Sequence, residues 1–491
     1  MNPENIISPP SRIAVLGAGI SGLSAAYRLN TLLKNAGNPG TKIDVWDKNS
    51  RVGGVLQTDH VDQYQIEQSA DNFITTVPWG LDLCKELGLT DQLVQTNAEY
   101  RRTYVVRRGR LHLLPDGFLM LAPTKLWPMA VTPILSPLGK LRAGLELLIP
   151  SRKDDADESM AQFVRRRLGK EVFERLVEPL VSGVYAADME KLSVLATLPR
   201  FREMEKQYGS LILAMQRQLK ANRAAHLSEQ SGARYSMFVT LKKGLSFLCD
   251  TLTGRLPDGC VHLGRPVVKM ERFRLDGTDA RRWKLTDSAG RCEEYDAVIC
   301  ALPSHEAARL LGDALPELTK PLGRIEHQGT AIATFAFHAD QLKQEIRGMG
   351  FVVPTIERCP ILAGSFSSLK YAHRAPAGRV LLRLFAGGAR APQMPDMDDE
   401  RLVPLLLAEL KKIVRIEGEP HLTMVSHWPR TMPQYHVGHL ELVAEIEKQV
   451  AALPDFAIAG NAFHGVGIPN CSRSGQLAAE KILKQKSESK S

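Results

Sequence analysis

The chain has 491 residues, and 44% of them are hydrophobic, so it can bury a large core and its length predicts two or three domains. It holds 63 lysines and arginines against 54 acidic residues, which gives a formal net charge of +9. This composition excludes a disordered protein. The charge alone leaves nucleic acid, an anionic membrane surface and an acidic small molecule open as partners.

The seven cysteines are scattered, odd in number and form no Cys-x-x-Cys pair. This pattern indicates neither a disulfide framework nor a zinc site, and it predicts a reducing compartment. Residues 1–10 are polar and lack the basic and apolar segments of a secretory signal. We therefore expect a cytoplasmic location.

A short apolar run at residues 13–16 leads directly into a glycine-rich turn and then into a helix rich in alanine and leucine. Gly17 suits the tight turn, Gly19 lets the backbone approach a pyrophosphate, and Gly22 lets the helix pack closely on the strand. The next predicted strand ends in Asp47, whose carboxylate can bind a ribose hydroxyl. This pattern predicts a dinucleotide-binding domain.

The residues after Asp47 favour FAD over NAD. Arg51 is followed by Gly53 and Gly54. An acidic strand end followed by an arginine and a glycine pair is typical of the flavin-binding version of this start. FAD is therefore the predicted cofactor.

The middle of the chain is predicted to be mainly helical. A helix at 75–87 and a pair of strands at 99–114 precede a helical pattern from 124 to 223. Residues 160–180 fit one amphipathic helix, and its basic residues are expected to form a solvated face. They are Arg165, Arg166, Arg167 and Lys170.

The most apolar stretch lies between residues 125 and 140. Three prolines interrupt it, and it is shorter than the ~20 residues that span a bilayer. It is predicted to be a packed helical subdomain, with contact to a membrane surface, helped by nearby lysines and arginines, as the alternative.

Later strands are predicted for two sheets. Apolar runs that return the chain to the nucleotide domain lie at 261–270, 283–286 and 297–301. Alternating residues that predict a mostly antiparallel second sheet lie at 330–337, 350–353 and 380–385. A last strand at 456–459 leads into a second glycine-rich loop and, from residue 475, a closing helix whose positive N-terminus is expected to face the flavin ring.

These elements predict an α/β fold in three parts: a Rossmann-like FAD-binding domain, an α+β substrate domain with a mixed sheet, and a helical subdomain. The discontinuous FAD-binding domain is assigned to 11–92, 235–308 and 420–485. The substrate-binding sheet domain is assigned to 93–115 and 309–419. The helical subdomain, whose membrane-facing orientation stays open, is assigned to 116–234.

Four further blocks lie at 113–125, 178–186 (EPLVSGVYA), 432–439 (MPQYHVGH) and 465–471 (GVGIPNC). With these blocks, the chain resembles the oxygen-dependent, FAD-containing porphyrinogen oxidases of haem biosynthesis. That family belongs to the amine-oxidase-like flavoprotein superfamily, and the resemblance is greatest to its soluble bacterial branch. The match covers nearly the whole chain.

The resemblance implies FAD contacts at Gly17, Ala18, Gly19, Ile20, Ser21, Gly22, Asp47, Val267, Trp428, Val466, Gly467 and Ile468. The motif itself adds Arg51, Gly53 and Gly54. One segment departs from the family, because residues 67–73 read EQSADNF where a Gly-Pro pair after a glutamate is usual. Arg102 is the nearest candidate for the family's substrate-facing arginine, although Thr103 occupies the expected position.

The implied activity is the six-electron oxidation of coproporphyrinogen III to coproporphyrin III, or of protoporphyrinogen IX to protoporphyrin IX, with release of hydrogen peroxide. Flavin N5 is expected to accept a hydride from a meso carbon, so no catalytic acid or base is predicted. His436 and His439 form one His-x-x-His pair without further ligands, and no metal is predicted.

The expected partners are a porphyrinogen and molecular oxygen, and no nucleic acid. A homodimer and peripheral contact with the inner face of the membrane stay open. Two other functions also remain as alternatives. One is another flavoenzyme of the superfamily, an amine oxidase or a carotenoid desaturase, and the other is a flavin-free prenyl-protein escort.

Overall fold

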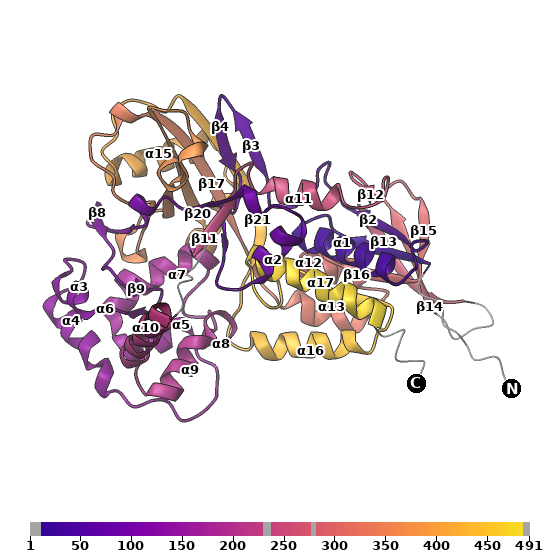
Figure 1. Cartoon of the computed structure of the whole chain (residues 1–491), viewed down its shortest axis with the longest axis horizontal. Coiled ribbons are helices and arrows are strands. Elements are labelled where there is room, and N and C mark those ends of the chain that lie inside the picture. Colours follow the sequence, from indigo (N-terminus) through magenta and orange to yellow (C-terminus); the bar gives the residue numbers. More distant parts are fainter. Residues whose placement is uncertain (1–10, 229–236, 276–280, 485–491) are drawn as a thin grey trace.

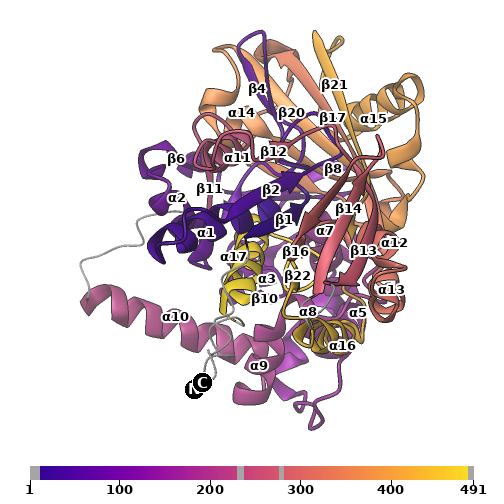
Figure 2. The same ribbon diagram turned by 90° about the vertical axis from the view of Figure 1, so that its right-hand side faces the viewer.

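The computed structural model describes residues 11–228, 237–275 and 281–484, so the expectation for residues 1–10 lies outside the described residues. Figure 1 shows a parallel sheet with its helices on the right, a larger sheet at the upper left and a helical part at the lower left. Figure 2 shows the larger sheet above and the helical part below, with α10 extending outward. The predicted α/β class is confirmed.

The parallel sheet has five strands in the order β12-β2-β1-β16-β22. Its strands are β1 (Arg12–Leu16), β2 (Lys42–Trp46), β12 (Val261–His262), β16 (Ala297–Cys300) and β22 (Phe456–Ile458). Most of their residues are buried, as expected for strands covered on both faces. In such sheets a ligand binds at the carboxyl edge, where the predicted glycine-rich turn lies.

Two helices that begin at this edge pack closely on each other. They are α1 (Ile20–Asn35) and α17 (Ile468–Lys484). A Cβ on Gly475 would lie 2.0 Å from the carbonyl oxygen of Ser21, so only glycine permits this approach. The closing helix α17 begins at Ile468, seven residues before the start predicted at 475, so Gly475 lies within the helix.

The other elements of this part are a three-stranded meander and several helices. The predicted strand at 261–270 is in fact two, because β12 ends before β13 (Val267–Arg274) begins. The meander continues with β14 (Arg281–Asp287) and β15 (Cys292–Tyr295). The helices are α2 (Trp79–Glu86), α11 (Ser246–Thr253), α12 (Ser304–Leu311), α13 (Pro316–Gly323) and α16 (His439–Ala451).

The larger sheet has seven strands in the order β21-β17-β20-β19-β18-β7-β8. Its strands are β7 (Thr103–Arg107), β8 (Arg110–Leu113), β17 (His327–His338), β18 (Gly350–Val352), β19 (Ile361–Phe366), β20 (Arg379–Gly387) and β21 (Leu422–Pro433). The β18–β7 pair is parallel and the other pairs are antiparallel. The predicted, mostly antiparallel sheet is confirmed, and α15 (Asp399–Ile413) packs on one face.

Short elements join the two sheets. They are β3 (Thr58–Val61), β4 (Tyr64–Glu67), β5 (Phe73–Ile74), β6 (Leu93–Gln95), β11 (Phe238–Leu241) and α14 (Ser367–Lys370). The helical part holds α3 (Leu126–Val131), α4 (Pro137–Gly144), α5 (Met160–Leu168), α6 (Lys170–Val172), α7 (Glu178–Tyr185), α8 (Val194–Thr197), α9 (Pro199–Tyr208) and α10 (Leu211–Ser228).

The prediction of one continuous helix at 160–180 is wrong, because the chain turns at Gly169 with φ of +91° and continues as shorter helical pieces. The prediction that Arg167 lies on a solvated face is also wrong. Its guanidinium is fully buried, pairs with Glu146 and donates to the carbonyl oxygens of Ile149 and Gly209. Neighbouring segments cover this side of α5, which helical periodicity alone cannot show.

Candidate functional site

The turn between β1 and α1 has the geometry of a phosphate cradle. A Cβ on Gly17, whose φ is +102°, would lie 2.9 Å from the Ala301 carbonyl oxygen, and one on Gly22 would lie 1.8 Å from the Gly17 carbonyl oxygen. At Gly19, by contrast, a Cβ would meet no atom within 4 Å. The open space lies at the start of α1, where no side chain caps the helix. The free N–H groups there suit an anion such as a pyrophosphate.

Ala18, Ile20 and Ser21 complete this turn and are buried. Asp47, at the end of β2, accepts hydrogen bonds from the backbone N–H of Ala18 at 2.7 Å and of Asn49 at 2.8 Å. The Asp47 carbonyl accepts from Arg265 N, which brings the start of β13, at Val267, beside the same edge. These residues therefore lie around the turn.

The loop after Asp47 is fastened over the turn. Gly53 N donates to the Ala18 carbonyl at 2.8 Å, and a Cβ on Gly54 would lie 3.3 Å from Gly19 Cα. Arg51 maintains this loop, because its guanidinium donates to three carbonyl oxygens within the loop. They belong to Val52, Gly54 and Leu56. Arg51 therefore shapes the cradle through its loop.

A second group of residues lies beside the larger sheet. The indole N–H of Trp428, on β21, donates to the Gln68 carbonyl at 2.6 Å, which places the Ser69 and Ala70 segment next to the indole. The carbonyl oxygen of Ser69 accepts a hydrogen bond from Arg383. The departure from the family's Gly-Pro pair therefore lies where the larger sheet meets the dinucleotide domain.

Val466 and Gly467 immediately precede α17, which begins at Ile468. The hydroxyl of Tyr435 holds this loop, because it donates to the Asn461 carbonyl at 2.5 Å and accepts from Gly465 N at 2.8 Å. Burial raises the pKa of Tyr435 well above its usual value, so the phenol stays protonated as a donor. The predicted second glycine-rich loop is thus held at the N-terminus of α17.

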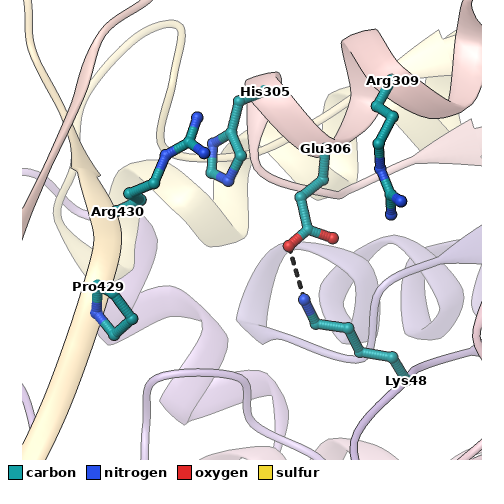
Figure 3. Close-up of a pocket in the computed structure, with 6 residues that line it drawn as sticks. All are labelled: Lys48, His305, Glu306, Arg309, Pro429 and Arg430. Carbon is teal, nitrogen blue, oxygen red and sulfur yellow. Dashed lines mark hydrogen bonds and ion pairs between the residues drawn. The ribbon is translucent and has the colours of Figure 1, made fainter. Parts of the chain in front are cut away.

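A cavity of about 410 Å³ borders both groups of residues (Figure 3). Lys48 follows Asp47 in the chain and pairs with Glu306 at 2.6 Å. Figure 3 also shows the guanidinium groups of two arginines at the same recess. The lining residues are Lys48, His305, Glu306, Arg309, Pro429 and Arg430.

The recess carries more positive than negative charge, since three cations face one carboxylate. Burial, and then the nearby Arg430, lower the pKa of His305, which favours a neutral ring. A recess of this charge beside Asp47 suits an anionic group of a dinucleotide. The sequence did not reveal it, because its residues come from α12, from β21 and from the loop after β2, which lie far apart in the chain.

Arg102 is exposed and lies immediately before β7, outside the residues that surround the turn and the recess. Thr103, the next residue, begins β7 and pairs with Gly350 on β18. His439 stacks on Tyr435 at a ring distance of 4.1 Å, and burial lowers its pKa to about 4. Within the described ranges, no group of three or more histidine, cysteine, aspartate or glutamate side chains is arranged to hold a metal.

A family model described as flavin containing amine oxidoreductase matches residues 20–483. The coproporphyrinogen III oxidase of Bacillus subtilis (strain 168) is 34% identical, covering 96% of this chain and 97% of that protein. Protoporphyrinogen oxidase 2 of Arabidopsis thaliana is 26% identical, covering 96% and 94%. A crystal structure of a protein from Exiguobacterium sp. 255-15 matches with a TM-score of 0.82 and 30% identity, covering 97% of this chain and 99% of that chain.

The open space at Gly19 allows a sharp test of the cradle. A Gly19→Glu side chain has room, and its charge favours the helix N-terminus, so the FAD-free protein should melt at the same temperature or higher. The same charge would occupy the anion position, so bound FAD should fall at least about tenfold. Flavin absorbance per protein measures the loss.

The matched control is Gly40→Glu, which also enters open space but lies away from the cradle. It should retain FAD like the original protein. Normal flavin content in Gly19→Glu would contradict the placement of the phosphates at this turn.

Proposed function

We propose, from the premise that this chain belongs to the flavin-containing amine oxidoreductase family, that it oxidises coproporphyrinogen III to coproporphyrin III in haem biosynthesis. One observation carries the proposal. The similarity to the Bacillus subtilis coproporphyrinogen III oxidase, at 34% identity, extends over almost the full length of both proteins. Identity to the Arabidopsis protoporphyrinogen oxidase is lower, at 26%. Protoporphyrinogen IX is therefore the second candidate substrate.

The chain's own residues supply a place for this chemistry. Bound FAD provides two-electron oxidation, by accepting a hydride from a substrate carbon. The glycine turn and Asp47 would hold the dinucleotide, and the N-terminus of α17 would favour negative charge beside it. Over three two-electron steps the substrate would lose six hydrogens, four from meso carbons and two from pyrrole nitrogens. Three of them would leave as hydride and three as protons to solvent, and oxygen would receive each electron pair as hydrogen peroxide.

The alternative functions fit less well. An amine oxidase or a carotenoid desaturase leaves the full-length similarity to porphyrinogen oxidases without an explanation. A flavin-free escort protein would not need the open cradle at Gly19 or the close approach at Gly22. We therefore favour the oxidase.

Aerobic assays of the purified protein test this proposal. We expect coproporphyrinogen III to give fluorescent porphyrin, with three hydrogen peroxide molecules per porphyrin because six electrons leave the substrate. We expect kcat/KM to be about tenfold or more higher than for protoporphyrinogen IX, which has two fewer carboxylates to bind.

Assays without oxygen and assays with catalase control for spontaneous oxidation. A yellow protein that is inactive on both porphyrinogens would contradict the proposal and favour amines or polyenes. A colourless protein would favour the escort function.

We further propose that the tip of the helical part contacts an anionic lipid surface from the cytoplasmic side. Large apolar side chains are exposed on α3, α4 and the turn that follows them, at the outer edge of the molecule in Figure 1. Trp127, Leu138 and Leu148 are 76%, 78% and 78% exposed. Lys125 immediately precedes α3 and Lys140 lies on α4, and both positive charges suit an anionic surface. None of the described helices is both long and apolar enough to cross a membrane.

Sedimentation with vesicles of phosphatidylcholine and phosphatidylglycerol tests this contact. Changing Trp127, Leu138 and Leu148 together to serine should lower the vesicle partition coefficient at least about tenfold, because their apolar area no longer enters the interface. The control changes Leu405, Leu440 and Leu477, which are also exposed but lie on α15, α16 and α17, and should bind like the original protein. Unchanged vesicle binding together with loss of a dimer would assign the patch to a homodimer instead.

A further inference from the structure

The face of the larger sheet that carries Trp428 is apolar at its two ends and charged between them. At one end, Val105 and Val352 pack into the helical part. At the other, Ala336 and Leu381 pack against β4. Arg383 lies between these ends on β20, on the same face as Leu381 because alternate residues of a strand share a face.

Arg383 is buried, and its hydrogen-bonding capacity is only partly used. Its side chain has no exposed surface, and Nη2 donates to the Ser69 carbonyl. Nε and Nη1 make no hydrogen bond to any residue of the described chain. Asp71 lies 3.7 Å from Nη1, which is ion-pair distance but too long for a hydrogen bond. Two guanidinium nitrogens thus remain available.

Ser365 adds a second polar group at the same place. It pairs directly opposite Arg383 in the β19–β20 register, so both side chains lie on one face of the sheet. Its buried Oγ also has no hydrogen-bond partner among the described residues. Buried polar groups in proteins are nearly always hydrogen-bonded, so these two neighbouring groups lack partners that a bound ligand would supply.

The charges around Arg383 leave a positive excess. Lys370 pairs with Asp71 at 2.9 Å, and Arg374 pairs with Glu67 at 3.5 Å, so both carboxylates already have a cation. Burial raises the pKa of Glu67, which reduces its negative charge further. Burial lowers the pKa of Arg383 to about 10, so the guanidinium remains charged at neutral pH. It therefore lacks a full counter-ion.

We infer that Arg383, together with Ser365, binds a carboxylate of the substrate inside the protein. This inference rests on the proposed function, since porphyrinogens carry ionised carboxylate side chains. A carboxylate would supply the missing counter-ion and accept hydrogen bonds from Nε or Nη1 and from the Ser365 hydroxyl. Arg383 would thereby fix the orientation of the macrocycle next to the segment that Trp428 holds.

Binding of coproporphyrin III and of its tetramethyl ester to the FAD-loaded protein, in the same detergent, tests the inference. The ester keeps the macrocycle but has no carboxylate charge. Arg383→Met should weaken binding of the acid by about 10- to 100-fold and leave binding of the ester unchanged. KM for coproporphyrinogen III should rise similarly, with little change in kcat. Arg383→Lys should restore part of the loss, because it keeps the charge.

Two further variants separate binding from folding. Ser365→Ala removes an unpartnered hydroxyl, so it should fold normally and weaken acid binding a few-fold. Arg167→Lys changes a buried arginine whose hydrogen bonds are satisfied, so it should lower the melting temperature without changing the ratio of acid to ester affinity. Flavin content and melting temperature are measured for every variant.

An unchanged ratio of acid to ester affinity in both Arg383→Met and Ser365→Ala would overturn the inference and leave the proposed oxidase intact. A shifted flavin reduction potential with unchanged porphyrin binding would assign the positive charge to the cofactor instead. If the original protein neither binds coproporphyrin nor oxidises its porphyrinogen, the proposed function fails, and the inference fails with it.

Discussion

The close contact between α1 and α17 is the constraint on which the candidate site depends. It exists because Gly475 has no side chain, so the backbone of α17 meets the Ser21 carbonyl. Arg28 and Glu480 pair at 2.8 Å further along the same two helices, which therefore run in the same direction. Both positive N-terminal ends thus lie at the carboxyl edge of the parallel sheet. One suits the phosphates of a dinucleotide and the other suits negative charge on its flavin.

A buried group of charges joins this cradle to the larger sheet. Burial opposes ionisation of the Asp71 carboxyl, but Lys370, Arg374 and Arg383 outweigh that effect and hold its pKa well below its usual range. Asp71 belongs to the segment that also contacts Trp428 through Gln68. The electrostatic contacts that fix the sheet against the dinucleotide domain therefore also shape the site. An ion cluster of this kind favours one arrangement of the two parts because a misplaced partner would leave a buried charge unpaired.

Local signals in the sequence predicted the glycine turn, Asp47 and the strands of both sheets, because turn chemistry and alternation depend on neighbouring residues. Contacts between distant segments could not be predicted in this way. Arg167 seemed solvated until the fold placed Glu146 beside it, and the recess at Lys48 needs residues from three separate elements. Arg383 did give a signal, as the charge in the interior of the strand RVLLRLFAG, with two apolar residues on either side, but only the strand register shows what it faces.

Anaerobic mixing of the FAD-loaded protein with coproporphyrinogen III tests the central claim most directly, because it observes electron transfer from substrate to cofactor without turnover. We predict that the absorbance of oxidised flavin disappears on mixing and returns when oxygen is admitted, with porphyrin formed in proportion. A flavin that stays oxidised in the presence of coproporphyrinogen III, yet is reduced by dithionite, would contradict it.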